Sequence, residues 1–469
     1  MSLADGRAIS PHDIVDAGLC IGCGSCAANG RDKGAAMRWD KFGQLKPSGP
    51  AEWYRTPDEG FSRTCPFSPK ARDEDQIAAA LYPDAAHVDG RVGRFETAYV
   101  GHVAEQDFRT QGSSGGMVTW VAAELIRRGM VDGVAHVAAT DPDAEGRFFG
   151  YRISRSEAEV RQGAKSRYYP IELSDVITAI RARPGRYAVI GVPCFIKAIN
   201  LLRREDPVIA QRVTYTLGLY CGHMKSAKLV DSFALQMGKA PDVVQAVNFR
   251  TKDAERPANW YRTQLTLRGG DKPEQDWWHL VEGDWGSGFF QNSACDFCDD
   301  VVAETADISF GDAWLEPYSS DPWGTNVVVV RSPMLRSIVD EAVAGQRLKL
   351  SEVDAEFVVQ TQAAGFRQRR EGLAFRLARR GPARRPLKRV APGADGLPWR
   401  RKLVYWTRGR ISAWSHRLFL AATKAGKPEL YFRAGRLMLA LYQGLIYSRG
   451  RAGAFFDRVE KRFGGKRES

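Results

Sequence analysis

Three cysteines near the N-terminus form the pattern with the clearest chemistry. Cys20, Cys23 and Cys26 are spaced as C-x2-C-x2-C. This spacing lets a tight loop direct three thiolates at three irons of one 4Fe–4S cluster, and the intervening glycines let the loop wrap closely. In bacterial ferredoxins a fourth cysteine follows in the same run and serves another cluster, but here Gly30 and Arg31 stand in that place. The pattern therefore predicts one cluster whose fourth ligand lies elsewhere.

Cys65, which precedes Pro66, fits the role of that fourth ligand. The competing interpretations are a zinc site or a loop of free thiols, but zinc sites more often combine two C-x2-C pairs or add histidines. The stretch 22–27 also matches G-x-G-x-x-A, a dinucleotide-binding pattern. That pattern needs a preceding strand and an opening helix, and neither is convincing here. We therefore assign these glycines to the cysteine loop.

The other four cysteines suggest a second centre. Cys295 and Cys298 form a C-x2-C pair, and Cys194 and Cys221 each follow a predicted strand. Strand ends on one edge of an α/β sheet are neighbours, so the four thiols could hold another 4Fe–4S cluster. Spacing alone leaves two alternatives open, zinc on the C-x2-C pair and buried cysteines that merely pack. His223 could be a ligand, a proton donor or a core histidine, and its spacing favours the last.

Strands and helices alternate through the middle of the chain, which favours an α/β (α+β) fold with a mixed sheet. The predicted strands are 97–103, 131–139, 187–192, 213–220 and 327–330. The predicted helices are 117–128, 171–182 and 195–204. Residues 1–90 have little apolar periodicity, so a metal cluster would have to hold them together. We therefore expect a small ferredoxin-type 4Fe–4S domain at 1–90, a mixed-sheet domain at 91–350 and a helical extension at 366–469.

The positive charge of the chain is concentrated in that extension. The net charge is +13, yet the residues from Arg367 onward contain 27 Lys and Arg against 6 Asp and Glu, a net +21, which leaves −8 on residues 1–366. Two amphipathic stretches, 402–422 and 429–447, carry aromatic and basic residues that suit an anionic membrane surface. Docking to a partner protein, simple helical packing and nucleic-acid binding are the alternatives. No recognised nucleic-acid module accompanies the charge, so we do not expect nucleic acid as a partner.

Cysteine usage also bears on the compartment. The N-terminus lacks the positive start and apolar stretch of a secretory signal, and no apolar run reaches about 18 residues. Without export, disulfides explain eight cysteines poorly, and metal or redox chemistry explains them better. We therefore expect a cytoplasmic protein, with residues 366–469 as the candidate for attachment to the inner face of the membrane.

Three motifs resemble a known family. The segments VPC at 192–194, GLYC at 218–221 and CDFCDDVVAETADISFGD at 295–312 are similar to those of the beta subunits of coenzyme F420 hydrogenases and dehydrogenases. The wider family includes 7-hydroxymethyl chlorophyll a reductase and the ferredoxin-dependent divinyl (proto)chlorophyllide 8-vinyl reductase. The resemblance covers roughly residues 15–345. One departure is Phe195, where several family members have Gln, so donor or substrate choice could differ.

The resemblance implies FAD and strengthens the second 4Fe–4S cluster on Cys194, Cys221, Cys295 and Cys298. Family members bind flavin at a glycine turn before a helix, where backbone amides can approach a pyrophosphate. The residues that match this position or the nearby G-x-K segment are Gln111, Ser113, Ser114, Gly115, Gly116, Met117, Lys165 and Ser166. Lys165, Tyr168 and His223 are the candidates for a catalytic acid or a flavin-tuning group.

The expected function is electron relay through two 4Fe–4S clusters to FAD, which reduces an organic substrate. Ferredoxin or another one-electron donor is the expected partner, and the substrate is a small or lipid-linked molecule. The reverse direction, with coenzyme F420 as hydride donor, stays open. The alternatives are an electron-transfer subunit that docks on a partner enzyme and has no substrate of its own, and a zinc-stabilised binding protein. Metal content and hydride-acceptor turnover by the isolated chain would separate the three.

Overall fold

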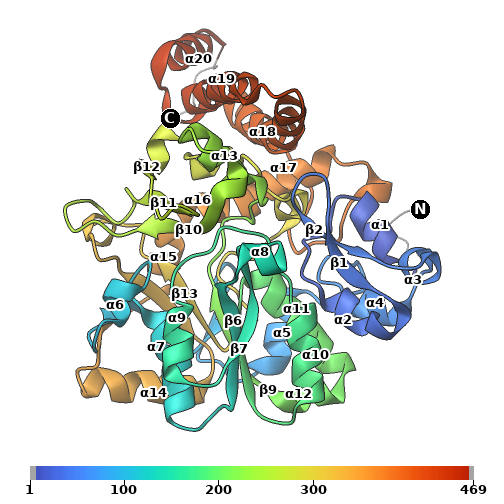
Figure 1. The fold of residues 1–469 in the computed structure, drawn as a ribbon, viewed down its shortest axis with the longest axis vertical. Helices are drawn as coiled ribbons and strands as arrows, with labels where there is room; N and C mark the ends of the chain where they lie inside the picture. The colour runs from blue at the N-terminus through green and yellow to red at the C-terminus, as the bar shows by residue number, and fades with distance from the viewer. Residues whose placement is uncertain (1–6, 464–469) are drawn as a thin grey trace.

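The fold was analysed in a computed structural model, which describes residues 7–463. Its centre is an eight-stranded sheet (Figure 1). The strands are β5 (Thr97–Val103), β6 (Gly133–Ala139), β7 (Phe149–Ser154), β8 (Tyr187–Gly191), β9 (Val213–Leu219), β13 (Ile308–Asp312), β14 (Asn326–Val330) and β15 (Leu348–Val353). They lie in the order β15-β5-β14-β13-β9-β8-β6-β7. β6, β8, β9 and β13 pair in parallel, and the remaining neighbours pair antiparallel.

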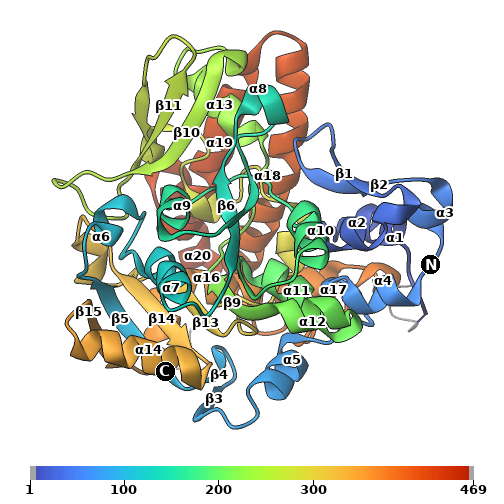
Figure 2. The ribbon, with the colours of Figure 1, turned by 60° about the horizontal axis from the view of Figure 1, so that its bottom comes forward.

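Helices cover both faces of this sheet (Figure 2). Both faces need cover because the side chains of β14 are apolar on both sides. Val328 and Val330 pack in one core, and Val327 and Val329 pack in another. A strand buried on both faces reads as a continuous apolar run. The first face is covered by α7 (Met117–Arg127), α9 (Glu157–Gln162) and α14 (Pro333–Ala344). The opposite face is covered by α10 (Ser174–Ala182), α11 (Pro193–Glu205) and α12 (Pro207–Arg212).

The N-terminal part is built of short elements. They are α1 (Pro11–Asp16), α2 (Ser25–Asn29), β1 (Ala36–Trp39), β2 (Leu45–Ser48), α3 (Ala51–Arg55), α4 (Glu59–Thr64), α5 (Glu74–Leu81), β3 (His87–Asp89) and β4 (Gly93–Phe95). Of these, α2 and α4 contact α10 and α11, while Phe95 of β4 packs with valines of β14. Backbone bonding joins this part to the main body, because the Leu173 amide donates to the carbonyl oxygen of Cys23 at 2.9 Å. The first cysteine loop is therefore attached to the segment that leads into α10.

A second, three-stranded sheet stands above the main one and completes the body. It contains β10 (Val244–Thr251), β11 (Arg262–Leu267) and β12 (Glu274–Asp276), flanked by α6 (Phe108–Gln111), α8 (Pro142–Glu145) and α13 (Lys228–Gln236). The 3-10 helices are η1 (Arg31–Lys33), η2 (Pro241–Val243), η3 (Trp277–His279), η4 (Trp285–Ser287), η5 (Ser293–Phe297), η6 (Tyr318–Ser320) and η7 (Pro382–Arg384).

The C-terminal region is helical and packs on the body. It contains α15 (Ala355–Thr361), α16 (Ala363–Arg369), α17 (Glu371–Arg379), α18 (Trp399–Lys424), α19 (Pro428–Tyr447) and α20 (Gly450–Phe463). The Phe290 amide donates to Ser415 Oγ at 3.0 Å, and the Tyr431 hydroxyl donates to Glu282 Oε1 at 2.7 Å. The long helices are therefore integral to the fold. No helix between residues 7 and 463 combines the length and apolarity that a bilayer crossing requires.

The predicted fold class is confirmed, since the chain forms a mixed α/β sheet followed by a helical C-terminal region. The strand expected at 97–103 has the bounds of β5, and the other predicted strands and helices differ from the observed ones by a few residues at their ends. The three domain ranges stay predictions. β15 runs past the expected end of the middle domain to Val353, and residues 1–6 and 464–469 of the outer two lie outside the described residues.

Candidate functional site

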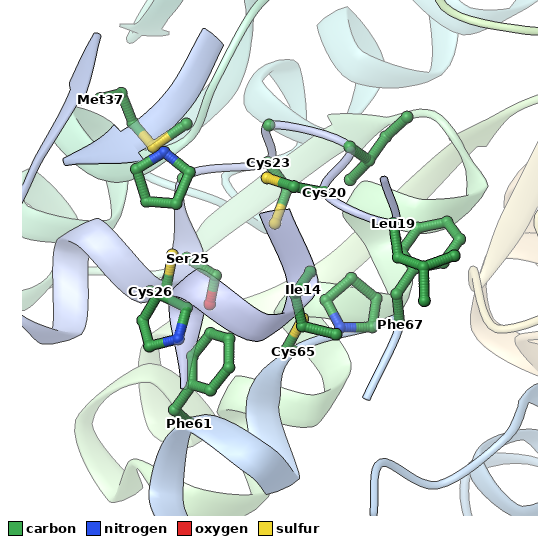
Figure 3. A pocket seen from close by; sticks show the side chains of 16 residues that line it. Ile14, Leu19, Cys20, Cys23, Ser25, Cys26, Met37, Phe61, Cys65 and Phe67 are labelled. Atoms are coloured by element: carbon green, nitrogen blue, oxygen red, sulfur yellow. The ribbon is translucent and has the colours of Figure 1, made fainter. Parts of the chain in front are cut away.

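A cavity among the N-terminal elements is lined by all four cysteines predicted for the first cluster. It holds about 410 Å³ of unfilled space, part of it open to solvent. Figure 3 shows the sulfurs of Cys20, Cys23, Cys26 and Cys65 around this space. None of the four forms a disulfide. Apolar side chains make up most of the remaining wall, among them Ile14, Leu19, Met37, Phe61 and Phe67.

The loop that carries the first three of these cysteines depends on two glycines with positive φ. The φ angles are +83° at Gly22 and +81° at Gly24, a region that glycine enters without steric cost. A Cβ on Gly22 would lie 2.6 Å from the carbonyl oxygen of Leu45, and one on Gly24 would lie 2.4 Å from Glu172 Oε2. The loop thus turns in a space that is closed to larger residues.

The chemistry of these thiols fits a cluster of several metal ions. Burial raises the pKa of Cys23 to about 12, and burial followed by repulsion from the other three thiols raises the pKa of Cys26 well above its ordinary value. Thiolates at this site therefore need bound cations, which iron would supply. Within residues 7–463, no three His, Cys, Asp or Glu side chains are arranged to hold one metal ion. A cubane places each thiolate on a different iron, so four sulfurs around one cavity are a ligand set that it could use.

The second four cysteines come from three segments of the main body. Cys194 lies in the first turn of α11, directly after β8, and Cys221 follows β9. Cys295 belongs to η5, and Cys298 stands at its end. β8 and β9 are neighbouring parallel strands, so their C-terminal ends bring the first two thiols to one edge of the sheet. The amide of Met224 donates to Cys295 Sγ at 3.3 Å.

Electrostatics joins these four thiols into one set. Burial, then repulsion from the other three, raises the pKa of Cys194 well above its ordinary value. Burial also raises the pKa of Cys221 to about 11 and that of Cys295 to about 12. The four free thiols lie close enough to repel one another electrostatically. Cysteines that only pack as small apolar side chains need not gather in this way. It fits a cluster of several metal ions by the same reasoning as the first set.

The two cysteine sets are neighbours. Cys23 adds to the repulsion that raises the pKa of Cys194, after the three thiols of the second set. The pKa of Tyr151 is raised by burial first, then by the charge of Cys194 and then by that of Cys23, so this tyrosine lies near both sets. Phe195 stacks on Tyr151 with ring centroids 6.3 Å apart. The departure from the family pattern at position 195 therefore lies where the two sets meet.

The segments predicted to bind flavin also come together. The amide of Ser166 donates to Ser113 Oγ at 2.8 Å, which joins the glycine turn to the G-x-K segment. Ser114 Oγ donates to a backbone carbonyl of the loop before β14, and Gln111 is exposed at the end of α6. Ser113 also lines a second cavity with about 280 Å³ of unfilled space. Of these predicted residues, Ser113 is the one that lines this cavity.

The glycine turn itself is packed tightly against the main sheet. A Cβ on Gly115 would lie 2.7 Å from Asn326 Oδ1, and one on Gly116 would lie 2.7 Å from the carbonyl oxygen of Phe108. The Met117 side chain is fully buried, and its amide donates to Asn326 Oδ1 at 3.1 Å. These three residues therefore fix the start of α7. The Met117 amide donates its hydrogen bond within the protein and is not free for a cofactor phosphate.

Lys165 and Tyr168 lie on the segment after α9, which the Ser166–Ser113 bond joins to this turn. Lys165 has a φ of +122°, an unfavourable conformation for a residue with a Cβ. Burial, then the charges of Arg167 and Arg250, lowers the pKa of Lys165. Burial raises the pKa of Tyr168, so its phenol keeps its proton at neutral pH. Just before them, Gly163 lies against the ring of His136, where a Cβ would be 2.2 Å from Cε1.

His223 is buried against the ring of Trp285, with centroids 4.4 Å apart. Burial, then the charges of Lys225 and Arg408, lowers the pKa of His223 well below its ordinary value. The ring is therefore neutral near pH 7, which fits a core histidine better than a proton donor. Trp285 also packs on Tyr168, with centroids 4.7 Å apart. One indole thus connects the segment after the second cysteine set with the segment predicted to bind flavin.

Sequence reasoning missed the basic residues of the second cavity. Arg250 and Lys252 line it beside Ser113. The Lys252 ammonium donates to the carbonyl oxygens of Ser114 at 3.0 Å and Trp323 at 2.6 Å, so it ties two loops together. Cationic side chains here fit a cofactor that carries phosphates. Isolated basic residues at a strand end form no motif, so only the fold could identify them. The lining also includes Arg256, Trp260 and Tyr261.

Two models of one family match the chain. The N-terminal model of the coenzyme F420 hydrogenase/dehydrogenase beta subunit matches residues 98–178, and the C-terminal model matches residues 185–356. No curated protein gave a significant match. A solved structure, the xenon-derivatised F420-reducing [NiFe] hydrogenase complex from Methanosarcina barkeri, contains a chain that is 16% identical, with a TM-score of 0.47. The match covers 64% of this chain and 98% of that chain.

Proposed function

The chain belongs to the coenzyme F420 hydrogenase/dehydrogenase beta subunit family, a family of oxidoreductase subunits, and we propose that it is an iron–sulfur flavoprotein that reduces an organic substrate. In this proposal residues 1–90 form a ferredoxin-type segment and residues 91–350 form the catalytic domain. The clusters supply one-electron transfer and FAD supplies hydride transfer. One 4Fe–4S cluster would bind to Cys20, Cys23, Cys26 and Cys65, and the second to Cys194, Cys221, Cys295 and Cys298.

Two adjacent sets of four free, buried or half-buried thiols carry this proposal. Each set needs cations to hold its sulfurs as thiolates, and the sets share the neighbourhood of Tyr151. Short spacing between redox centres is what sequential one-electron transfer requires. In the proposed order, a reduced ferredoxin or another one-electron donor would deliver electrons to the first set.

The remaining residues orient and protect the reaction. Tyr168 keeps its proton near pH 7 and is our candidate proton donor, with the positive charge of Arg250 acting on it. Lys165 is our candidate for the group that tunes the flavin. Trp285 packs between Tyr168 and His223, and His223 follows Cys221 of the second set by two residues. Arg250 and Lys252 would face the phosphates of FAD.

The test is composition after anaerobic purification of the full chain. We expect about eight irons, about eight sulfides and about one FAD per chain, because each cubane holds about four of each. Cys26→Ala and Cys295→Ala should each remove about half of the iron. The control is Ser351→Ala, since Ser351 is exposed on β15 and lines neither cavity. Zinc without flavin would refute the proposal.

An electron-transfer subunit without its own substrate is the second candidate, because the matching family is named for the beta subunit of larger enzymes. The two candidates differ in the behaviour of the isolated chain. If the reduced chain alone turns over coenzyme F420 or another hydride acceptor, it is a reductase. If it loses electrons only to a partner enzyme, the second candidate holds.

Attachment to an anionic membrane is part of the proposal for α18 and α19. Exposed apolar and basic side chains alternate along α19, where Leu430, Leu437 and Leu441 are exposed beside Arg433 and Arg436. This combination suits the interface of an anionic bilayer. Removal of residues 366–469 would be a poor test, because these helices bury core residues against the body. Exposed side chains on the helix surface offer a cleaner one.

Leu437 and Leu387 provide a matched pair, because each is 73% exposed but only Leu437 lies on α19. We expect the chain to sediment with phosphatidylglycerol vesicles and not with phosphatidylcholine vesicles. Leu437→Gln should weaken sedimentation with the anionic vesicles, whereas Leu387→Gln should not. Equal sedimentation of both variants and the unchanged chain would contradict membrane attachment through this face.

A further inference from the structure

Residues 366–389 lie past the end of both family matches, and we call this segment the basic strap. It comprises the end of α16, α17, η7 and the residues that follow. Figure 1 shows α17 beside the N-terminal elements, although more than 300 residues separate them in sequence. The strap therefore passes close to both cysteine sets.

Arg369 anchors the strap at the second cysteine set. It is 3% exposed, and its Nη2 donates to the carbonyl oxygens of Cys221 at 2.6 Å and Gly222 at 2.8 Å. Its Nη1 is buried without a hydrogen-bond partner in the described structure. A buried guanidinium nitrogen without an acceptor is costly, so an absent acceptor is implied. The positive charge of Arg369 acts on the thiols of Cys221, Cys295 and Cys298.

The next arginines of the strap hold the loops on either side. Arg376 Nε donates to the carbonyl oxygen of Asp296, between the two cysteines of the C-x2-C pair, at 2.7 Å. Arg380 lies over the ring of Phe297, 4.4 Å from its centroid, and donates to the carbonyl oxygen of Ala17. Ala17 stands just before the first cysteine loop. One side chain thus connects the loops of both cysteine sets.

The end of the basic strap also contacts the segments of both cysteine sets. Lys388 Nζ lies 3.2 Å from Asp299 Oδ1 and 4.9 Å from the ring centroid of Phe67, which follows Cys65 and Pro66. Arg389 forms two bonds with the buried carboxylate of Glu304, at 2.7 and 2.9 Å. These charges are not a solvated surface. They neutralise buried acids of the segment that follows the C-x2-C pair.

A buried cubane with four thiolates is an anion, and its reduction adds another negative charge. In a protein interior an anion of this kind depends on nearby cations and donors. Reduction potentials of such clusters respond to net charge, hydrogen bonds to the sulfurs and solvent exposure. Arg369 offers a permanent positive charge, a free N–H and exclusion of water at one place.

We infer that the basic strap is a built-in electrostatic cap of the second cluster, in which Arg369 donates to the cluster or its thiolates and stabilises the reduced state. Arg369 is a positioning and tuning residue, and its guanidinium stays protonated throughout. The electron that the second cluster gains is the one that the first cluster loses, and no proton moves with it. This inference rests on the proposed function, because it requires a 4Fe–4S cluster at the second site.

The test is a redox titration of the full chain, followed by electron paramagnetic resonance under anaerobic conditions. Arg369→Gln should lower the ratio of reduced to oxidised second cluster at least tenfold at a fixed potential, a downward shift of about 59 mV for a one-electron couple. Arg379→Gln is the matched control, because it removes the same charge from an exposed position of the strap. The control should leave the midpoint potential unchanged.

An unchanged midpoint potential in Arg369→Gln, with full iron content, would overturn the inference. If Arg369→Gln loses the second cluster, the midpoint potential is measured in Arg369→Lys instead. It keeps the charge but cannot span both carbonyls and the sulfurs, so its midpoint should still fall, and a midpoint equal to that of the unchanged chain would overturn the inference. Failure of the proposed function would look different, since the unchanged chain would then lack iron at the second site.

Discussion

We expect His136 to make the stability of the region proposed to bind flavin depend on pH. It is 5% exposed, its Nε2 lies 2.7 Å from Ser154 Oγ, and Gly163 of the G-x-K segment packs against its ring. Burial lowers the pKa of His136 from 6.5 to about 4. The folded protein thus holds the neutral ring at pH values where the unfolded chain binds a proton. The resulting stabilisation is complete above pH 6.5 and is lost as the pH falls toward 4.

The size of this effect follows from the shift in pKa. A shift of about 2.5 units at about 1.36 kcal/mol per unit gives about 3.4 kcal/mol of unfolding free energy in total. About 1.4 kcal/mol of it is lost by pH 5.5, one unit below the unfolded pKa. Because a charged imidazole would displace Gly163, we expect flavin to dissociate over the same pH range.

The assay is urea unfolding at pH 7.5 and pH 5.5, followed by tryptophan fluorescence, with flavin release measured in parallel. His136→Gln keeps a hydrogen bond to Ser154 but cannot titrate, so it should lose about 1.3 kcal/mol less than the unchanged chain between the two pH values. His87→Gln is the control, because His87 is exposed. Equal losses in the unchanged chain and His136→Gln would refute the reasoning.

Three further substitutions test the packing around the sites. Gly163→Ala should cost about 1–3 kcal/mol in unfolding free energy and lower flavin content, because the new Cβ would lie 2.2 Å from His136 Cε1. Lys252→Met should lower the ratio of flavin to iron, since it removes the ammonium that ties two loops of the second cavity. Arg389→Met should cost about 3–5 kcal/mol in urea unfolding, because it removes both close bonds of the buried Glu304 carboxylate and leaves only the longer ion pair with Arg370 at 3.7 Å.

Each of these substitutions has a control of the same chemical type. Gly269→Ala adds a methyl group with no atom within 4 Å, and it should leave stability and flavin content unchanged. Lys272→Met removes an exposed ammonium, and Arg379→Met removes an exposed guanidinium. If a control lost as much stability or flavin as its test variant, the effect would come from general destabilisation or from charge. That result would contradict the contact assigned to the test residue.

Local pattern predicted the elements of the main sheet well. The run of valines at 327–330 and the helix stop at Gly129 are signals that lie within a few residues, so β14 and α7 appear close to their predicted bounds. Two predicted strand ends that precede Cys194 and Cys221 became neighbouring parallel strands, as the α/β rule requires. The first cysteine loop also turns at its glycines as expected.

The partners of the basic residues in the C-terminal extension could not be predicted from local pattern. A run of charged residues is usually exposed to solvent, and the acids that pair with Lys388 and Arg389 lie 85 residues or more away in the sequence. Nothing in the local pattern marks Asp299 or Glu304 as their partners. The same holds for Arg369, whose role depends on a contact with a loop about 150 residues earlier. Long-range pairing of this kind is set by the assembled fold.

The position of Arg369 in the chain has a consequence for biosynthesis. All eight cysteines leave the ribosome before the strap does, and Arg369 follows Cys298 by about 70 residues. At roughly 5 to 20 residues per second, translation leaves roughly 4 to 14 s in which the second site is complete but uncovered. The proposed second cluster would have this interval for the delivery of its iron and sulfide. The arrival of the strap then closes the site, so the order of synthesis allows loading to precede sealing.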